Sequence, residues 1–472
     1  MKNIAYSLFL LTFLLYTASC KKNRDTEKPI EKNIDKEIEN WLSKTGIPST
    51  SIVLFKNGNV LKSKAYGYSN LKTKTLANTS TIYNTGSNFK SVTATAIMQL
   101  EEKGLIDIDK PINTYLKEPI KYFNKNTPIT ARHLMSHQSG IPSSIGINKV
   151  WERKPNRTLR EIVTAIKPTT KPDEKHIYSN DGYALLGLLI EDVTGLTYEE
   201  YIWKNILDPL GIETFGFLRP TPEMIEDLAL PYHIRYNQAY PTNQLHLEQY
   251  PAGDIFLKPI DMAKFLMMHL NEGEISSTKI LSKKSVEKMH LPNLEVEENF
   301  YYGLGFGIDQ IDGKNYSYHQ GSLPGYLSVF QIDFETKTGV YITSNVSSSP
   351  IQDKQINLLL KYLFEYVKND NLKRDLEVPI NKKTPVSRTI KLGNYIGKYK
   401  IEGAPVYLTI DKIGNQLFLI NPAKERFRIE SLNSNRFFIT TENEDIEFKE
   451  NKGNIESLKI FSMGKEINAK KE

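Results

Sequence analysis

The chain of 472 residues contains one cysteine, Cys20. A single cysteine cannot form a disulfide within the chain, so internal cross-links are excluded as a source of stability. The length suggests roughly two or three domains of about 150 residues each. A hydrophobic fraction of 39% is sufficient for packed cores. The sequence therefore predicts a globular protein that is stabilised by apolar packing.

The excess of positive over negative charge is also small. The net charge is only +6 on 472 residues, and the lysines are scattered among acidic residues instead of gathering in one block. Domains that bind nucleic acid usually carry a basic patch or stripe. The charge pattern therefore argues against nucleic acid as a partner.

The apolar run "IAYSLFLLTFLLY" near the N-terminus is too short to span a bilayer comfortably. Lys2 precedes this run, and the small residues Ala18 and Ser19 follow it, directly before Cys20. A basic start, a short apolar segment and a small-residue end are the pattern of an export signal. The ending "TASC" resembles the lipobox of bacterial lipoproteins, with Thr17 where leucine is most frequent.

The resemblance to a lipobox implies that residues 1–20 are a lipoprotein signal peptide and that Cys20 is lipidated. We therefore expect an exported protein, on the periplasmic or outer-surface side, that is anchored to a membrane through the lipid on Cys20. Acyl chains contribute about 0.8 kcal/mol of membrane affinity per buried methylene. Residues 21–33 are polar and charged and predict a flexible tether. The alternative is that Cys20 is an incidental residue of a cleaved signal peptide.

The rest of the chain divides into a mixed α/β segment over residues 34–370, a lysine-rich linker over 371–388 and a C-terminal β segment over 389–472. Residues 34–45 have helical spacing of apolar positions, and two β-like runs joined through Asn57-Gly58 follow. Residues 85–215 are mainly helical, with "SVTATAIMQLEEKG" and "GYALLGLLIEDVTG" as helices that end at glycine. Four strand-like runs begin near residue 302 with "YGLGFGI", and an amphipathic helix follows.

This order predicts one antiparallel sheet built from both ends of residues 34–370, covered by terminal helices, with a helical subdomain inserted between them. Residues 389–472 alternate in short strands with turns every 8 to 12 residues. That spacing predicts a separate small antiparallel β-barrel or sandwich.

The segment "TGSNFKSVTATAIMQLEEKG" places Ser87 at the start of a helix and Lys90 three residues later. The two side chains therefore lie on one face, one turn apart. A serine hydroxyl becomes a strong nucleophile when a nearby base removes its proton, and lysine is such a base when burial lowers its pKa. The helix N-terminus and the Ser87 N–H group favour a developing oxyanion.

The spacing Ser-x-x-Lys alone is weak evidence, because it also occurs in this chain at Ser19, Ser69, Ser276, Ser285 and Ser462. Only Ser87 opens a long apolar helix after a glycine. The alternative for Ser87 and Lys90 is a helix cap followed by a lysine whose amine reaches solvent.

Residues 35–370 resemble the serine hydrolase family of class C β-lactamases, D-alanyl-D-alanine carboxypeptidases, D-aminopeptidases and related esterases. The resemblance is carried by segments in the order of that family: "GLIDIDKPINTYL", "ITARHLMSHQSGIP", "YSNDGYALLGLLIEDVTG", "PAGDIFLKPIDMAKFL" and "YGLGFGI". It implies the β-lactamase/transpeptidase-like fold, with a five-stranded antiparallel sheet, terminal helices and an inserted helical subdomain. The C-terminal segment resembles the small barrel-like domains appended to some members.

The resemblance also implies roles for individual residues. Ser87 matches the nucleophile, Lys90 its partner base, and Tyr178 the residue that moves protons to the leaving group. Asn180 matches the amide that orients the acyl side of the substrate. Two cationic neighbours could favour the tyrosinate form of Tyr178, although a coupled Ser-Lys-Tyr site need not have a single assignable base.

Two segments compete for the cleft strand that closes such a site, His319-Gln320-Gly321 and Lys337-Thr338-Gly339. The second lies between two strand-like runs, where a turn would direct Lys337 to water. The first is followed by Pro324-Gly325, as the family's third motif is followed by a Pro-Gly turn. We therefore place His319 and Gly321 in the cleft, with the N–H of Ser322 as the second oxyanion donor.

Histidine at position 319 bears on the substrate. A lysine there would be a permanent cation that binds the carboxylate of a β-lactam or a terminal D-alanine, whereas histidine is mostly neutral at pH 7. We therefore expect a hydrolase of D-amino-acid peptides, amides or small esters. The alternatives are a β-lactamase or penicillin-binding DD-carboxypeptidase, and a binding or sensor module that is acylated without turnover.

His133 and His137 stand four residues apart, a spacing that can bind zinc from one helix face. Leu134 occupies the position where the helical metalloprotease pattern needs glutamate, and no third ligand cluster is evident. We therefore expect no metal and no organic cofactor.

Overall fold

The computed structural model describes residues 29–123, 128–143, 147–148, 157–235, 238–369, 375–378, 391–439, 444–462 and 465–472. The predicted signal peptide with Cys20 lies outside the described residues, as does most of the predicted linker over 371–388.

One antiparallel sheet of nine strands organises the larger body, in the order β13-β14-β15-β16-β17-β18-β1-β2-β3. Its strands are β1 (Ser49–Lys56), β2 (Asn59–Asn70), β3 (Thr75–Leu76), β13 (Leu294–Glu297), β14 (Phe300–Tyr302), β15 (Gly307–Ile311), β16 (Lys314–Leu323), β17 (Tyr326–Asp333) and β18 (Thr338–Ser344). β1 pairs with β2 on one side and with β18 on the other, which joins the two ends of this segment as predicted. The five expected strands form the centre, β16-β17-β18-β1-β2, and four more extend the sheet.

The segment "YGLGFGI" is not one strand, contrary to the sequence prediction. β14 ends at Tyr302, and β15 begins at Gly307. Gly305 between them has a φ of +84°, and a Cβ atom there would lie 2.4 Å from the Cβ of Ala94. This backbone conformation and the close approach to the helix that contains Ala94 interrupt the strand.

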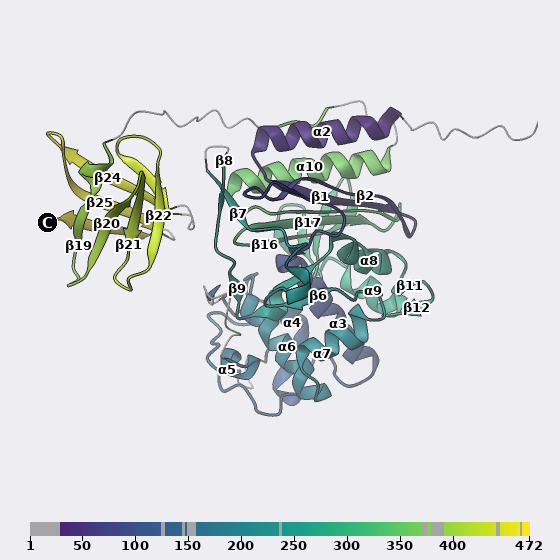
Figure 1. Ribbon diagram of the computed structural model, residues 1–472. Helices are drawn as coiled ribbons and strands as arrows, with labels where there is room; N and C mark the ends of the chain where they lie inside the picture. The colour runs from purple at the N-terminus through teal and green to yellow at the C-terminus, as the bar shows by residue number, and fades with distance from the viewer. Residues whose placement is uncertain are drawn as a thin grey trace, which may run out of the picture.

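Two helices cover one face of the sheet, α2 (Pro29–Thr45) and α10 (Pro350–Lys368), and they form the upper layer in Figure 1. Trp41 of α2 and Leu359 of α10 have no exposed surface and belong to the same apolar cluster as Ile52 and Ile342 of the sheet. The predicted covering by terminal helices is therefore present.

The helical body lies on the other face of the sheet (Figure 1). It is built around α3 (Lys90–Glu102), α6 (Asn180–Thr194) and α8 (Pro259–Leu270), with the shorter helices α4 (Ala131–Met135), α5 (Leu159–Val163), α7 (Tyr198–Ile202) and α9 (Lys283–Met289). Gly195 follows α6 in the left-handed conformation, as the sequence predicts for the end of this helix. A small sheet of β4 (Tyr83–Asn84), β10 (Ile255–Leu257) and β6 (Phe215–Phe217) connects this body to the segment before α3.

The C-terminal segment forms a closed barrel of β19 (Gly397–Ile401), β20 (Tyr407–Ile413), β21 (Gln416–Ile420), β22 (Arg426–Ser431), β23 (Arg436–Ile439), β24 (Asp445–Asn451), β25 (Asn454–Ser462) and β26 (Lys465–Lys471). Its apolar core is separate from the two cores of the larger body. This confirms the predicted β-barrel. Among the described residues, no helix is both long and apolar enough to cross a bilayer.

Candidate active site

Ser87 lies in a 3₁₀ turn, η1 (Gly86–Phe89), that runs directly into α3. The turn is fixed to the sheet, because Asn88 Nδ2 donates to Ser328 Oγ at 2.9 Å. Ser328 Oγ in turn donates to the carbonyl oxygen of Thr85 at 2.6 Å. These bonds hold the serine at the boundary between the central sheet and the helical body.

Lys90 is the first residue of α3, and its side chain has no exposed surface. Its Nζ is 2.8 Å from Asn180 Oδ1, 2.8 Å from the carbonyl oxygen of Ala252 and 3.0 Å from Ser87 Oγ. Burial lowers the pKa of Lys90 well below its usual value. A neutral amine has two N–H bonds and one lone pair. In the neutral form of Lys90, donation of both hydrogens to the two carbonyl oxygens would leave the lone pair for the Ser87 hydroxyl.

Tyr178 precedes α6, and its hydroxyl is hydrogen-bonded to Ser87. Burial raises the pKa of Tyr178, and the bond to Ser87 opposes this only in part. The residue retains 39% exposure, so burial acts on the hydroxyl end that faces Ser87 and Lys90. The Lys90 amine lies 4.8 Å from the centre of the ring. The raised pKa favours the protonated phenol at neutral pH over the tyrosinate form that two cationic neighbours could favour.

Asn180 opens α6, so the N-terminus of that helix points at the Ser87 site. Its Oδ1 accepts from Lys90, and its backbone N–H donates to Ser143 Oγ at 2.8 Å. The structure thus brings Asn180 together with the three residues Ser87, Lys90 and Tyr178, which the sequence places in two segments about 90 residues apart.

Backbone segments converge closely on Ser87, and glycines permit the approach. A Cβ atom at Gly321 in β16 would lie 2.2 Å from the Thr85 carbonyl oxygen and 2.9 Å from the Ser87 nitrogen. A Cβ atom at Gly253 would lie 2.3 Å from the Gly86 carbonyl oxygen. A side chain at Gly321 or Gly253 would push the backbone away from the nucleophile. Because Ser322 follows Gly321, its backbone also runs beside the turn that holds Ser87.

His319 is buried in β16, with 5% exposure, and both of its ring nitrogens have partners. Nε2 is 2.7 Å from the hydroxyl of Tyr302, and Nδ1 is 2.8 Å from the carbonyl oxygen of Gln320. Since a carbonyl oxygen only accepts, Nδ1 carries the hydrogen and Nε2 accepts from Tyr302. Burial lowers the pKa of His319 to about 3.

The side chain of His319 is therefore neutral, and both of its ring nitrogens already have partners within the protein. Sequence reasoning did not single out its neighbour Tyr302, which begins the segment "YGLGFGI". The place of Tyr302 at the start of a family segment was the only indication in the sequence. The spacing of residues does not reveal that the Tyr302 hydroxyl contacts His319.

Asn84 and Asp254 form a second support of the nucleophile turn that sequence reasoning missed. Asn84 Oδ1 accepts from the Gly86 N–H at 2.9 Å, and Asn84 Nδ2 donates to Asp254 Oδ1 at 2.6 Å. Asp254 Oδ2 accepts from the Leu247 N–H at 2.7 Å. Burial raises the pKa of Asp254 to about 7. Asp254 lies in the segment "PAGDIF", but the sequence does not show that its carboxyl group meets Asn84, 170 residues away.

Lys337-Thr338-Gly339 does not line this site. Lys337 is exposed in the turn before β18, with a φ of 49°. Contrary to the prediction of a turn, Thr338 and Gly339 are the first residues of β18, where Gly339 leaves room for the ring of Phe55.

His133 and His137 face different partners despite their spacing. His133 Nδ1 accepts from the Thr130 N–H, and its Nε2 is 3.0 Å from Asp173. His137 Nδ1 accepts from the Ser179 N–H. In the part of the chain that the structure describes, no group of three or more His, Cys, Asp or Glu side chains is arranged to hold a metal ion.

A sheet covered by helices, with a serine at the head of a helix and a buried lysine beside it, defines a class: serine hydrolases with the β-lactamase/transpeptidase fold. Comparison with known families identifies the family within this class. The profile of the family named Beta-lactamase matches residues 30–362, and the chain belongs to that family. Proteins with penicillin-binding names and D-amino acid amidases are among its relatives and structural neighbours.

Two relatives illustrate the similarity in sequence. "Putative penicillin-binding protein PbpX" of Bacillus subtilis (strain 168) is 30% identical over 332 residues, which cover 70% of this chain and 78% of PbpX. "Protein flp" of Staphylococcus aureus (strain N315) is 28% identical over 323 residues, which cover 67% of this chain and 64% of flp.

Two solved structures illustrate the similarity in fold. An octameric penicillin-binding protein homologue from Pyrococcus abyssi superposes with a TM-score of 0.61 at 25% identity, and the match covers 93% of this chain and 100% of the homologue. D-amino acid amidase from Ochrobactrum anthropi SV3 superposes with a TM-score of 0.63 at 22% identity, and the match covers 73% of this chain and 100% of the amidase. The family and fold that the sequence predicts are thereby confirmed.

Proposed function

We propose that the protein hydrolyses amides, peptides or esters of D-amino acids, or small esters, through an acyl-enzyme at Ser87. The observation that carries this proposal is the set of three contacts made by Lys90. They leave one acceptor on a buried, uncharged amine, directed at Ser87 Oγ. The distance of 3.0 Å between Lys90 Nζ and Ser87 Oγ is within the reach that a general base needs.

In the first step, Lys90 accepts the proton of Ser87 as Oγ forms a bond to the substrate carbonyl carbon. The carbonyl oxygen becomes an oxyanion beside the backbone N–H groups of Ser87 and Ser322, a contribution of about 3 to 4 kcal/mol in comparable sites. The protonated phenol of Tyr178 donates to the leaving nitrogen or oxygen as its bond to carbon breaks. The proton on Lys90 then passes to the phenolate oxygen of Tyr178, which restores both side chains to their starting forms.

In the second step, water replaces the leaving group. Lys90 removes a proton from that water as it attacks the acyl carbon, and this proton passes to Ser87 Oγ as the ester bond breaks. Both steps use side chains already in place, and Asn180 is positioned to orient the acyl part of the substrate. No metal or organic cofactor enters either step.

The neutral His319 supports the choice of substrate. A cation at this strand would attract a carboxylate, whereas the occupied imidazole offers none. The solved D-amino acid amidase has the same fold, which is compatible with an amide substrate. We therefore rank amides and esters above substrates that end in a free carboxylate.

A panel of D-phenylalanine amide, L-phenylalanine amide, a p-nitrophenyl ester and a chromogenic cephalosporin tests this ranking. We expect turnover of the ester and of the D-amide, little turnover of the L-amide and slow turnover of the cephalosporin. Fast cephalosporin hydrolysis would overturn the argument from His319.

Acylation without turnover is a second candidate, favoured by the penicillin-binding name of the relative PbpX. A burst of labelling by a fluorescent penicillin, with no steady product from any member of the panel, would support a binding or sensor role. The same burst followed by steady hydrolysis of the D-amide would exclude it.

Export and lipid anchoring at Cys20 are part of the proposal and rest on residues 1–33 of the sequence. Labelling of cells with an alkyne fatty acid should tag the wild-type protein and not Cys20→Ser. Equal tagging of both would contradict the anchor.

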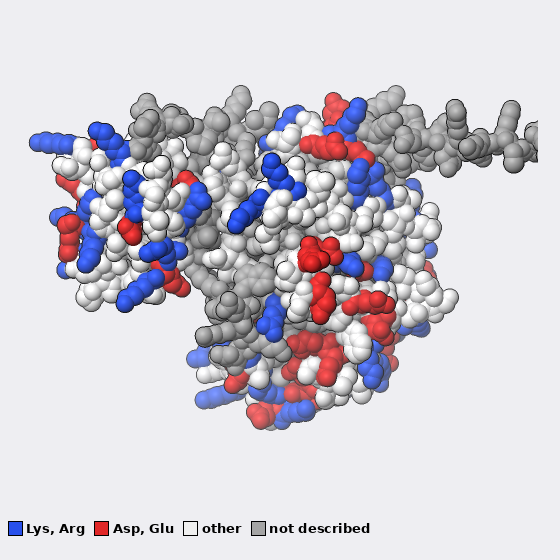
Figure 2. Space-filling view, viewed as in Figure 1, with Lys and Arg blue, Asp and Glu red and all other residues white. Residues whose placement is uncertain are grey.

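We further propose that nucleic acid is not a partner. On the face shown in Figure 2, blue and red side chains are intermingled on both the barrel and the larger body. A basic stripe of the kind that tracks a phosphate backbone is not seen among the described residues of that face.

A further inference from the structure

A cleft of about 740 Å³ lies on the face of the sheet opposite the Ser87 site. It forms where the sheet continues past α10, which packs over β17, β18 and β1. Side chains alternate between the two faces of a strand. Accordingly Tyr318 of β16 reaches Asn357 of α10, whereas the next residue, His319, meets Tyr302 beside the active site.

The walls of the cleft are mainly aromatic and aliphatic. Two ring pairs meet edge to face: Phe300 and Tyr318 at 6.4 Å between centres, and Tyr316 and Phe364 at 5.7 Å. Gly307 leaves space for one of these rings, because a Cβ atom there would lie 2.8 Å from Phe300 Cζ. The apolar lining residues are Phe300, Ile311, Tyr316, Tyr318, Leu360 and Phe364.

Asp309 of β15 is one of three carboxylates that line this cleft, together with Glu297 and Glu365. It is the cross-strand neighbour of Phe300 on one side and of Tyr316 on the other. Within the described residues, its carboxylate has no hydrogen bond and no ion pair. Burial alone raises its pKa to about 6, and no basic side chain opposes that shift. At neutral pH the carboxylate is therefore ionised, partly desolvated and without a cation.

The other charged side chains that line the cleft do not supply a cation for Asp309. They are Glu297 of β13 and Lys361, Glu365 and Lys368 of α10. Lys368 Nζ donates to Asp333 Oδ2 at 2.8 Å and to the Tyr316 hydroxyl at 3.2 Å. Lys361 is exposed to solvent. The unmatched charge in the cleft is therefore negative.

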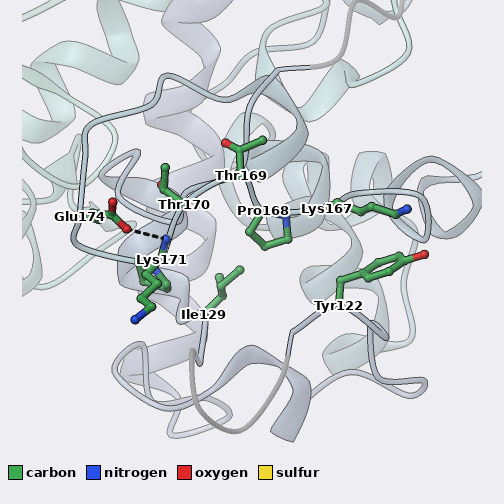
Figure 3. A pocket seen from close by; sticks show the side chains of 9 residues that line it. Tyr122, Ile129, Lys167, Pro168, Thr169, Thr170, Lys171 and Glu174 are labelled. Atoms are coloured by element: carbon green, nitrogen blue, oxygen red, sulfur yellow. Dashed lines mark hydrogen bonds between the residues drawn. The ribbon is translucent and has the colours of Figure 1, made fainter.

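A second hollow, of about 470 Å³, is weaker as a binding site (Figure 3). There the amine of Lys167 lies over the ring of Tyr122 at 4.7 Å, and Glu174 accepts from the Lys171 N–H at 3.2 Å. These charged groups thus already have partners within the protein.

From the aromatic walls and the unpaired carboxylate, we propose that the cleft between α10 and strands β14–β16 binds an organic ammonium ion with an aromatic or branched apolar body. Lys368 Nζ already lies over the rings of Tyr316 and Phe364, at 4.8 and 5.5 Å from their centres. The rings of Phe300 and Tyr318 are therefore the ones that attract the ligand cation, and the Asp309 carboxylate forms a charge-assisted hydrogen bond with its N–H groups. The apolar body covers Phe300 and Leu360 and excludes water from the ion pair. This site is separate from the one that holds the acyl-enzyme.

Calorimetric titration of the full chain at pH 7.5 with 2-phenylethylammonium and with the neutral isostere 2-phenylethanol tests this site. We expect the ammonium to bind about tenfold more tightly than the alcohol, as charged hydrogen bonds generally confer. Asp309→Asn should remove this preference without changing ester hydrolysis. Asp312→Asn is the matched control and should retain the preference, because Asp312 is exposed in the turn between β15 and β16 and does not line the cleft.

A second variant keeps the test independent of the Asp309 substitution. Phe300→Leu retains an apolar wall but removes one ring face, so it should weaken the ammonium more than the alcohol. Three results would overturn the proposal: no binding of either probe, no preference in the wild-type protein, or a preference that persists in Asp309→Asn. Loss of probe binding after Ser87 is blocked by a fluorophosphonate would also overturn it, because the probe would then occupy the active site.

Discussion

A lysine with no exposed surface must lose its charge or have that charge compensated. Lys90 has three polar partners, Ser87, Asn180 and Ala252, and none of them is anionic. The pKa of Lys90 is therefore lowered. A lysine with a lowered pKa can act as a base for Ser87. The sequence predicts this pair from a serine and a lysine at the head of an apolar helix. It cannot predict the carbonyl of Ala252, because that contact joins segments 162 residues apart.

Lys90→Arg should abolish acylation while retaining a positive side chain. A guanidinium stays protonated and has no lone pair for the Ser87 proton, so we expect a fall of at least about 10³-fold in the acylation rate. Stopped-flow measurement with a p-nitrophenyl ester reports this rate. Lys103→Arg is the control, because Lys103 is exposed at the end of α3. Acylation of Lys90→Arg at a rate near that of the wild-type protein would contradict the assignment of the base.

Asp254 should make the unfolding free energy depend on pH. Its pKa is about 7 in the folded protein and 3.8 for an ordinary aspartate, so the folded state binds the proton more tightly. Stability from this group is therefore greatest at low pH and is lost as pH rises to about 7. Between pH 5 and pH 8 we expect the wild-type protein to lose about 2 to 3 kcal/mol more than Asp254→Asn.

Urea unfolding at the two pH values measures this difference, with Asp312→Asn as the control for an exposed carboxylate. Equal pH dependence in the wild-type protein and in Asp254→Asn would show that the buried carboxyl group is not the source.

At the scale of elements, β16 separates two environments. Its Gly321 end lies against the Ser87 turn, and its Tyr318 side chain faces the cleft under α10. The sequence predicts the strand from its apolar alternation and its following turn. It does not predict the break within "YGLGFGI", because that break depends on how closely Gly305 approaches α3. Helices α3 and α6 are predicted well, since their apolar periodicity is long and a glycine lies just beyond the end of each one.

Gly321→Ala should lower acylation while the fold persists. The added methyl group would lie 2.2 Å from the Thr85 carbonyl oxygen, so β16 must move away from Ser87. Misplacing an oxyanion donor costs about 10² to 10³ in rate, and we expect a loss of that size in kcat for ester hydrolysis. Gly393→Ala is the matched control, because a Cβ atom there meets nothing within 4 Å. Equal activity of the two variants would contradict the account of this strand.

At the scale of the whole molecule, the chain contains two units with separate cores. The described contacts between them include an ion pair of 3.8 Å from Arg235 to Asp445 and a ring contact between Tyr240 and Phe438. An exposed ion pair contributes about 0 to 1 kcal/mol. Residues 375–378 still belong to the larger body, because the Leu376 N–H donates to Glu37 Oε2 at 3.1 Å.

Removal of residues 379–472 should therefore leave catalysis nearly unchanged. We expect kcat/KM for the ester to stay within about threefold of the full chain, less than about 1 kcal/mol of activation free energy. Calorimetry should show one unfolding transition fewer than in the full chain. A loss of activity in a shortened chain that still unfolds cooperatively would show that the barrel contributes to the active site.

The most direct test of the central claim is the mass of the protein trapped during turnover of a p-nitrophenyl ester, followed by mapping of the modified peptide. We predict one acyl group on Ser87 in the wild-type protein, which disappears as the ester is consumed. Ser87→Ala should carry none. An acyl group on another residue, or equal acylation of Ser87→Ala, would contradict the account.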